Sequence, residues 1–462
     1  MNTKVIFFIN LLVIIFALAF TLRSYLLIKY KWVGKDTFYH LIVAQTINNK
    51  KRIPEFIDNF IVPENYSYPP LFHIFLSKFS SNKHQILQYI GPLSDILTGI
   101  VIFLFCFVLF DIKVATLASA LYLFTPLTID GSFSLNPRGP ANFCLTTSLL
   151  SLSFYYLTGL VTSIYISIIF SVFVLLTHRL TTQSLIFSMI GISIGLHSIV
   201  PICVLILSIF ISIIVTKGYY IKVIKGHIDF IKIFGMKLIK KESRKEMENI
   251  LPKPIYFLFN LPIFILFTIT WFLPKPSEAE CLYIIGMSLT ILSIIWVFGE
   301  GVRHMSNAIF SFSILSALLI TKICESLIII VILTSFIFSI YKIMRIENKL
   351  DLGNITNTKM LDGFEYIKSH QEKNDILLCL PLDITYNAAY FTDCLMLQSS
   401  GGFAQGLSFN QKLKNQLEKG EINSLLKKYK VKWIFNMSES RISAGKEVYR
   451  KGEISIIDLS AE

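Results

Sequence analysis

The sequence predicts an α-helical polytopic membrane protein that carries a small α/β domain at its C-terminal end. Of 462 residues, 53% are hydrophobic and only 16% are charged, whereas soluble domains average about 25% charged residues. The mean hydropathy is +0.62, and the apolar residues gather in runs close to the length of about 20 residues that a bilayer-crossing helix needs. After residue 343 the chain becomes polar and alternates between helical and strand patterns. A soluble enzyme, a secreted disulfide scaffold and a disordered chain are excluded.

The first 343 residues contain the segments that we expect to span the membrane. They are residues 5–28, 87–110, 113–130, 141–159, 160–177, 184–216, 254–273, 281–299, 304–322 and 325–343. One straight helix over 184–216 would be about 50 Å long, against a hydrocarbon core of about 30 Å. We therefore expect a break near His197–Pro201 and two short helices there, which gives about 11 spans and places the two termini on opposite sides.

The N-terminal segment resembles a secretory signal peptide. Lys4 precedes an apolar run that contains Ala17-Leu18-Ala19, the small-residue pattern of a cleavage site. The apolar run continues to about Ile28, which is long enough to cross a bilayer. We therefore expect an uncleaved anchor.

The net charge of +13 comes from 43 Lys and Arg against 30 Asp and Glu. Residues 217–253 are basic and place apolar residues at helical spacing between lysines, which predicts an interfacial amphipathic helix. We expect anionic membrane lipids as partners and no nucleic acid, because no zinc finger or RNA-recognition signature is present. The positive-inside rule favours a cytoplasmic 217–253, whereas eleven spans place it outside. If 184–216 were one span, 217–253, Arg303 and the tail would be cytoplasmic.

The C-terminal tail, residues 344–462, has the pattern of a soluble α/β domain next to the membrane domain of residues 1–343. We expect helices at 358–370 and near Thr385–Phe391, strands at 375–381, 394–399, 431–435 and 453–459, a turn at 401–406 and a Lys-rich helical region ending at Lys430. A disulfide between Cys379 and Cys394 is one possibility. The cysteines within apolar segments are expected to act as small hydrophobic residues.

The polar loop after the first span, residues 29–86, holds the residues that could carry chemistry. Asp36 and His40 are spaced i, i+4, so they share one face if the stretch is helical. Tyr68-Pro69-Pro70 predicts an extended entry into an apolar helix that carries His73. For Asp36 alone, a helix N-cap is the simple alternative.

Residues 34–80 resemble the first external loop of GT-C glycosyltransferases, a superfamily that includes protein O-mannosyltransferases and the catalytic subunit of oligosaccharyltransferase. The resemblance is carried by DTFYH, which begins at Asp36, and by YPPLFH, residues 68–73. Such enzymes move a sugar from a polyprenyl-phosphate carrier to an acceptor. The resemblance implies a GT-C-like membrane domain, an extracytoplasmic tail domain and Asp36 as the general base, with His40, Tyr68 and His73 binding substrate.

One departure concerns a metal. Some GT-C enzymes use a second acidic pair of the DxD or DxE type, and we find none here. A divalent cation, Mg²⁺ or Mn²⁺, therefore stays an open option without an assigned site. Asp130 is the better candidate to share such a metal with Asp36. Asp95 is a second carboxylate near a span end, and both could simply bond neighbouring helices.

The leaving group of such a reaction is a lipid phosphate, which cationic side chains would stabilise as the glycosidic bond breaks. Candidates lie at the ends of apolar segments and are Arg138, His178, Arg179, Arg303 and His304. Arginine at a span end also serves as an interface anchor, which is the simpler interpretation of Arg179. Glu300 could pair with Arg303, and His73, His178 and His197 could be structural.

These expectations define an inverting, polyprenyl-phosphate-sugar-dependent transferase on the outer side of the plasma membrane, with a glycan, glycolipid or protein as acceptor. An oligosaccharide ligase or polymerase is an alternative, but it would need a large external loop with paired arginines late in the chain. A lipid or solute transporter or flippase is another, but it should show inverted repeats. The sequence shows neither feature.

Overall fold

The computed structural model describes residues 3–62, 65–129, 131–239, 279–295, 301–323, 325–348, 350, 355–399, 404–437 and 445–460. The chain forms two compact units. The helical unit comprises Met1–Tyr25, Tyr89–Phe133 and Pro137–Asn348, and the sheet unit comprises Leu26–Gln88, Ser134–Asn136 and Lys349–Glu462. Each unit is described by itself.

The helical unit consists of apolar helices, as an integral membrane protein requires. They are α1 (Thr3–Lys29), α5 (Ile90–Leu109), α6 (Ile112–Leu123), α7 (Pro126–Ile129), α8 (Arg138–Thr158), α9 (Thr162–Thr177), α10 (Arg179–Gly195), α11 (Val200–Val215), α12 (Tyr219–Ile239), α16 (Glu280–Ile294), α17 (Gly301–Ile323) and α18 (Leu327–Glu347). Among the described residues, α1, α5, α17 and α18 are long and apolar enough to cross a bilayer, and α6, α9, α11 and α16 are shorter apolar helices. The expected span at 254–273 lies outside the described residues, so the count of about 11 stays a prediction.

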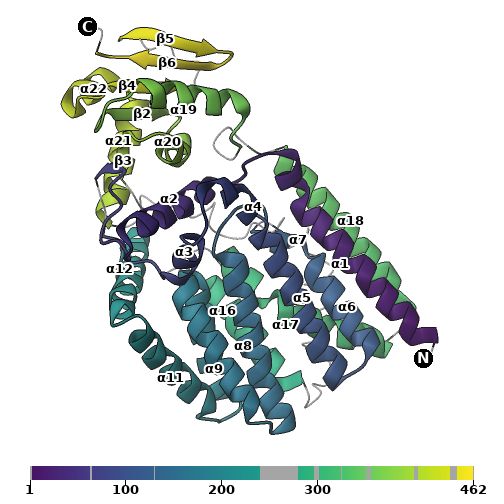
Figure 1. Cartoon of the computed structure of the whole chain (residues 1–462). Helices are drawn as coiled ribbons and strands as arrows, with labels where there is room; N and C mark the ends of the chain where they lie inside the picture. Colours follow the sequence, from purple (N-terminus) through teal and green to yellow (C-terminus); the bar gives the residue numbers. More distant parts are fainter. Residues whose placement is uncertain are drawn as a thin grey trace. The chain divides into compact units, whose positions relative to one another are not determined.

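Figure 1 shows the arrangement of these helices, and small residues lie at several of their interfaces. α8 packs against α5 and α9, and α17 packs against α6 and α16. The Ser148 hydroxyl of α8 lies 3.2 Å from the Ser167 hydroxyl and 2.8 Å from the Ser171 hydroxyl of α9. A Cβ added to Gly191 of α10 would lie 1.9 Å from the Ser288 hydroxyl of α16. Close approach over small residues with hydrogen bonds between helices is the usual way of packing in a bilayer.

The long apolar stretch 184–216 is broken where the sequence predicts. α10 ends at Gly195 and α11 begins at Val200, and His197 between them has a left-handed backbone with φ +49°. Pro201 lies in the first turn of α11, where a missing N–H costs no hydrogen bond. The predicted helix within 217–253 is also confirmed over Tyr219–Ile239, and residues 240–253 lie outside the described part.

The sheet unit is built on six strands in the order β1-β3-β2-β4-β6-β5. They are β1 (Phe60–Val62), β2 (Ile376–Leu380), β3 (Leu395–Ser399), β4 (Trp433–Asn436), β5 (Lys446–Lys451) and β6 (Ile454–Asp458). The first four in this order run parallel, and β6 and then β5 are added antiparallel. The small α/β domain predicted from the tail is therefore present, with β1 and β5 as strands that the sequence did not predict.

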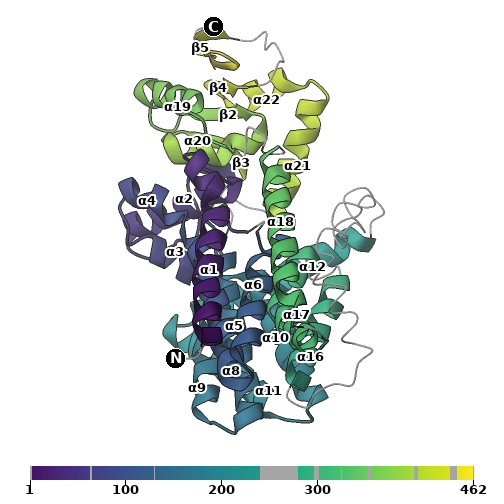
Figure 2. The same cartoon turned by 90° about the vertical axis from the view of Figure 1, so that its right-hand side faces the viewer.

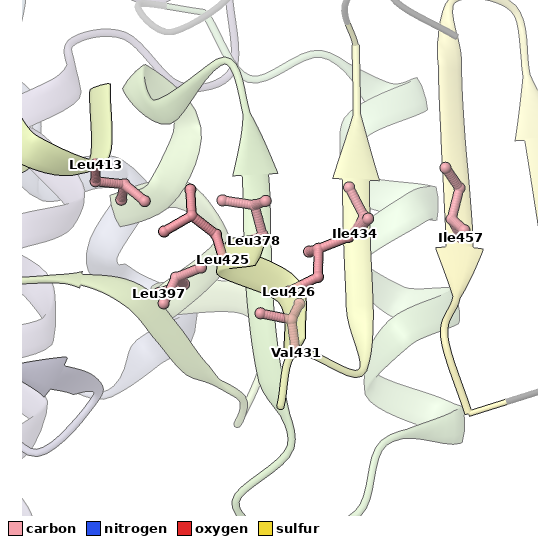
Figure 3. Packing of buried hydrophobic residues seen from close by; sticks show 8 residues of the cluster. All are labelled: Leu378, Leu397, Leu413, Leu425, Leu426, Val431, Ile434 and Ile457. Atoms are coloured by element: carbon pink, nitrogen blue, oxygen red, sulfur yellow. The ribbon is translucent and has the colours of Figure 1, made fainter. Parts of the chain in front are cut away.

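Helices cover both faces of this sheet, as Figure 2 shows. On one face lie α21 (Ala404–Glu418) and α22 (Ile422–Tyr429), whose Leu413, Leu425 and Leu426 pack with strand residues such as Leu378 and Ile434 (Figure 3). On the other face lie α19 (Thr358–His370) and α20 (Thr385–Phe391). There the Phe364 ring stacks on the Phe435 ring with centroids 4.6 Å apart.

The sheet joins the first loop to the tail, because β1 of the loop pairs with β3 of the tail, Phe60 opposite Met396. The compact units thus divide the chain differently from the expected boundary at residue 343. Cys379 and Cys394 are free thiols, and the Cys394 thiol donates to the side-chain amide oxygen of Gln371 at 3.0 Å. The disulfide that the sequence left open is not formed.

Candidate functional site

Asp36 lies in the first turn of α2 (Lys35–Lys50), and its side chain is exposed. The N-cap of α2 is Gly34, so the simple interpretation of Asp36 as an N-cap is wrong. A carboxylate in the first turn of a helix is still favoured by the helix dipole. The expected helix is confirmed, so Asp36 and His40 share one face of α2.

The start of α2 is fixed by close contacts with residues distant in sequence. Gly34 has φ +89°, and a Cβ there would lie 2.2 Å from the Ser134 Cβ, so only glycine fits. The Thr37 hydroxyl accepts a hydrogen bond from the Leu135 N–H at 3.0 Å and donates to the Val33 carbonyl at 2.7 Å. The turn that carries Asp36 is therefore held against the segment Ser134–Asn136.

α2 also packs on α20 of the tail, through the side of the helix that carries Phe38. The Phe38 ring lies 5.5 Å from the Tyr390 ring and 5.4 Å from the Phe391 ring, measured between centroids. Trp32, just before α2, contacts the same two rings. Aromatic pairs at these distances stabilise a fold by more than the burial of their apolar surface alone. The tail thus supports the helix that presents Asp36.

Two histidines predicted as substrate-binding residues lie in direct contact. His40 Nδ1 is 2.8 Å from His73 Nε2, and the Tyr66 hydroxyl is 2.6 Å from His73 Nδ1. His73, on α3 (Leu71–Leu76), is fully buried. Burial, and then the nearby His40, hold the pKa of His73 well below its usual range, so the ring is neutral near pH 7.

Tyr68 lies beside the two histidines. Its ring centroid is 5.6 Å from that of His73 and 6.2 Å from that of His40, and the side chain is half-buried. Tyr66 completes this cluster and was not singled out from the sequence, although it lies in the same YSYPP segment as Tyr68. The histidines and Tyr68 predicted in the first loop therefore come together in the sheet unit.

The predicted cationic residues belong to the helical unit. Arg138 is the first residue of α8, and His178 lies between α9 and α10, where its Nδ1 is 2.8 Å from the Thr181 hydroxyl. Arg179 is 3% exposed and lies over the Phe230 ring of α12, its guanidinium carbon 5.7 Å from the centroid. Arg179 is therefore buried within the helical unit, and its interpretation as an interface anchor stays a prediction.

His304 of α17 is fully buried and lies 3.1 Å from the Ser184 hydroxyl of α10. Asn307 donates to the same hydroxyl at 2.8 Å. Since α10 begins at Arg179, this one helix connects the groups around His178 and His304. Arg303 is partly exposed in the first turn of α17, and its expected partner Glu300 lies outside the described residues.

The sequence did not single out Arg23 of α1, which is fully buried. Its guanidinium donates to Asp95 at 2.9 Å, to the Leu123 carbonyl at 2.5 Å and to the Thr128 hydroxyl at 2.9 Å. The Ser132 hydroxyl donates to the same Asp95 oxygen at 2.5 Å. Asp95 therefore serves to join helices, which was the simpler of its two interpretations.

A metal site finds no support among the residues that the structure describes. No group of three His, Cys, Asp or Glu side chains there could hold a metal ion. Asp130, the predicted partner of Asp36 in such a site, lies outside the described residues. We therefore assign no metal ligand among the described residues, and a site for Mg²⁺ or Mn²⁺ stays an open option.

Comparison with solved structures identifies the fold. The chain superposes on ArnT from Cupriavidus metallidurans bound to undecaprenyl phosphate with a TM-score of 0.62 at 11% identity, covering 98% of this chain and 97% of that chain. It superposes on the oligosaccharyltransferase AglB from Archaeoglobus fulgidus, in complex with an inhibitory peptide and a dolichol-phosphate, with a TM-score of 0.60 at 12% identity, covering 95% and 70%. No protein-family model and no curated protein sequence matches the chain. The chain therefore has the fold of ArnT and AglB, which agrees with the fold that the resemblance of residues 34–80 implies.

Proposed function

We propose that this chain is an inverting glycosyltransferase that transfers a sugar from a polyprenyl-phosphate carrier to a hydroxyl or other acceptor. The observation that carries the proposal is the exposed Asp36 carboxylate, held in the first turn of α2, on a fold shared along nearly its whole length with ArnT, a protein solved with undecaprenyl phosphate. The helical unit supplies the apolar surroundings that a lipid-linked donor needs.

Asp36 acts as the general base. A hydroxyl is a poor nucleophile at neutral pH, and a carboxylate within hydrogen-bond reach accepts its proton as the new bond to the anomeric carbon forms. The bond between that carbon and the phosphate oxygen breaks, and its electron pair leaves with the phosphate. Because this is a single displacement, the configuration at the anomeric carbon inverts.

Arg138 and Arg303 stabilise the phosphate as it leaves. Guanidinium groups bind phosphate through two parallel hydrogen bonds. Arg138 is the first residue of α8, and Arg303 lies in the first turn of α17. Leu135, which Thr37 holds next to Asp36, precedes Arg138 by only three residues along the chain. The proposal that Arg138 binds the phosphate rests on its cationic side chain and on its place at the start of a helix.

The histidines and Tyr68 shape the site around these groups. His40, Tyr68 and His73 line the acceptor side next to Asp36, since they lie on the same α2 or pack against it. We assign His178 and His304 to donor binding, and both side chains are buried and held by Thr181 and Ser184. We place the active site and the sheet unit on the outer face of the plasma membrane, with a glycan, glycolipid or protein as acceptor.

A second candidate is the transfer of a whole oligosaccharide, which the likeness to AglB favours. The lengths argue for the first candidate, because the alignment covers 97% of ArnT but only 70% of AglB. Nothing in the described residues favours a transporter or flippase.

The test compares Asp36→Asn with Asp58→Asn, a matched change in the same loop at an exposed carboxylate that pairs with Lys50. Purified protein in lipid nanodiscs is incubated with labelled polyprenyl-phosphate sugars and a panel of acceptors. We expect Asp36→Asn to lower transfer by about 10²-fold to 10⁴-fold, the usual contribution of a general base, while undecaprenyl-phosphate binding is kept. Asp58→Asn should transfer at the wild-type rate. Near-normal transfer by Asp36→Asn would remove the base assignment.

A further inference from the structure

The sheet unit has a topology that creates a ligand site in many α/β proteins. The chain runs from β2 through α20 to β3, and then through α21 and α22 to β4, so that β3 and β4 flank β2 on opposite sides. The two connections lie on opposite faces of the sheet (Figure 2), as the right-handed crossover rule requires. The strand order therefore reverses at β2. In such sheets ligands bind outside the carboxyl end of the strand at the reversal.

A pocket of about 760 Å³ lies at this carboxyl end, a volume within the range of small-molecule sites. β2 ends at Leu380, and Pro381 and Asp383, which follow it, line the pocket. The remaining described lining comes from two other segments of the same unit: Lys29, Tyr30 and Lys31 at the end of α1, and Leu350 and Ile355–Thr358 before α19.

The lining combines cations with hydroxyl and amide groups. Lys29 and Lys31 are exposed, and the Lys29 ammonium lies 5.6 Å from the Tyr30 ring centroid. Thr356 is 2% exposed, and its hydroxyl oxygen accepts a hydrogen bond from the buried Asn387 amide at 2.8 Å. Because a hydroxyl also carries one proton, Thr356 keeps a donor for a further partner.

We propose that this pocket binds a phosphorylated polyol. The two lysines hold the phosphate through charge-assisted hydrogen bonds. Asp383 accepts hydrogen bonds from the ligand's hydroxyls, and Asn357 and Thr356 provide further polar contacts. A pocket lining with two lysines and one carboxylate suits an anion that also carries hydroxyls better than a bare phosphate ion.

Two sources offer this chemistry. One is the glycerol-phosphate headgroup of a membrane lipid, since Lys29 is the last residue of an apolar helix long enough to cross a bilayer. The other is a soluble polyol phosphate. The inference stands without the proposed transferase activity, because it concerns a pocket formed by residues other than those assigned to the transfer.

The experiment measures both sources with the full-length protein. In the first arm, isothermal titration of detergent-solubilised protein compares sn-glycerol 1-phosphate with glycerol and with inorganic phosphate. In the second arm, native mass spectrometry counts phosphatidylglycerol and phosphatidylcholine retained by the protein. The variants are Lys29→Gln/Lys31→Gln, which removes both pocket charges, and Thr358→Trp, which fills the pocket without changing charge. Lys368→Gln/Lys373→Gln changes two exposed lysines outside the pocket lining and is the charge-matched control.

We expect one ligand of the glycerol-phosphate class to bind, and both pocket variants to weaken it about tenfold or more, through loss of two charged contacts or of space. The control pair should bind like wild type. Binding of sn-glycerol 1-phosphate supports a soluble ligand, and selective retention of phosphatidylglycerol supports a lipid headgroup. Equal weakening by both lysine pairs, or no binding in either arm by folded wild-type protein, would overturn the proposal.

Discussion

Tyr66, His73 and His40 form a line of hydrogen bonds whose middle ring is fully buried. A neutral imidazole donates from one nitrogen and accepts at the other. The proton on His73 therefore fixes the roles of both neighbours: if Tyr66 donates to Nδ1, Nε2 donates to His40, and the reverse order follows if Nδ1 carries the proton. Protonating His73 would give it two donors, so that Tyr66 and His40 would both have to accept.

The lowered pKa of His73 predicts a loss of stability in acid. The unfolded chain takes up a proton near the ordinary histidine pKa of about 6.5, whereas the folded protein does so only at lower pH. Stability is therefore fully present above about pH 6.5 and falls as pH drops through the window below it, by at most about 1.4 kcal/mol per pH unit for this group. Burial lowers the pKa of His84 too, which adds in the same direction.

The measurement is the unfolding midpoint between about pH 5 and about pH 7.5, where histidines titrate. His73→Gln should flatten the pH dependence even though it lowers stability overall. His370→Gln, at an exposed histidine, should leave the slope as in wild type. An unchanged slope in His73→Gln would show that His73 is not the titrating group.

At the scale of elements, the buried Arg23–Asp95 pair ties α1 to α5 and, through Leu123 and Thr128, to the region of α6 and α7. Each guanidinium nitrogen has a partner among these groups. Removing one member of a buried pair costs more than the pair contributes, because the other charge stays buried.

Asp95→Asn should therefore lower the free energy of unfolding by about 3 to 5 kcal/mol. Denaturant titration in one detergent measures it. Replacing both partners with apolar residues, Arg23→Met with Asp95→Leu, should recover most of the loss. Glu325→Gln breaks the more exposed pair with Lys113 and should cost less than about 1 kcal/mol. Equal costs for Asp95→Asn and Glu325→Gln would contradict the assignment.

The helices and strands of the sheet unit show which elements could be predicted from the sequence and which could not. α19 and α20 match the expected 358–370 and Thr385–Phe391 because their apolar residues follow helical spacing and, for α19, Asn357 caps the start. β5 was missed because KEVYRK exposes residues on both faces and shows no alternation. β1 was missed because three residues in a polar loop become a strand only through pairing with β3.

Candidate residues could be predicted together where they lie close to one another in the sequence. Contacts between residues far apart in the sequence could not be predicted. Asp36, His40, Tyr68 and His73 lie within one loop, and the resemblance identified them together. Arg23 could not be found in this way, because an arginine inside an apolar run gives no sign of the carboxylate it meets 72 residues later.

At the scale of the molecule, α2 depends on residues about 350 positions further along the chain, since Phe391 packs on Trp32, Phe38 and Phe364. Phe391→Ala should destabilise the sheet unit by about 3 kcal/mol and speed chymotryptic cleavage after the buried Phe38 by roughly a hundredfold. Tyr449→Ala, which removes a ring contact with Tyr366 on α19, is the control and should leave Phe38 protected. Cleavage equally slow in both variants would show that α2 does not rely on the tail.

The pairing of Phe60 with Met396 also sets a timetable for biosynthesis. These residues are 396 − 60 = 336 positions apart, and ribosomes add about 5 to 20 residues per second. The edge strand of the nascent loop therefore waits roughly 20 to 70 seconds for its neighbour, while the intervening apolar helices enter the bilayer. Throughout that delay Trp32, Phe38 and Phe60 lack the surface that later covers them, so this loop can mature only after Phe391 and Met396 have left the ribosome.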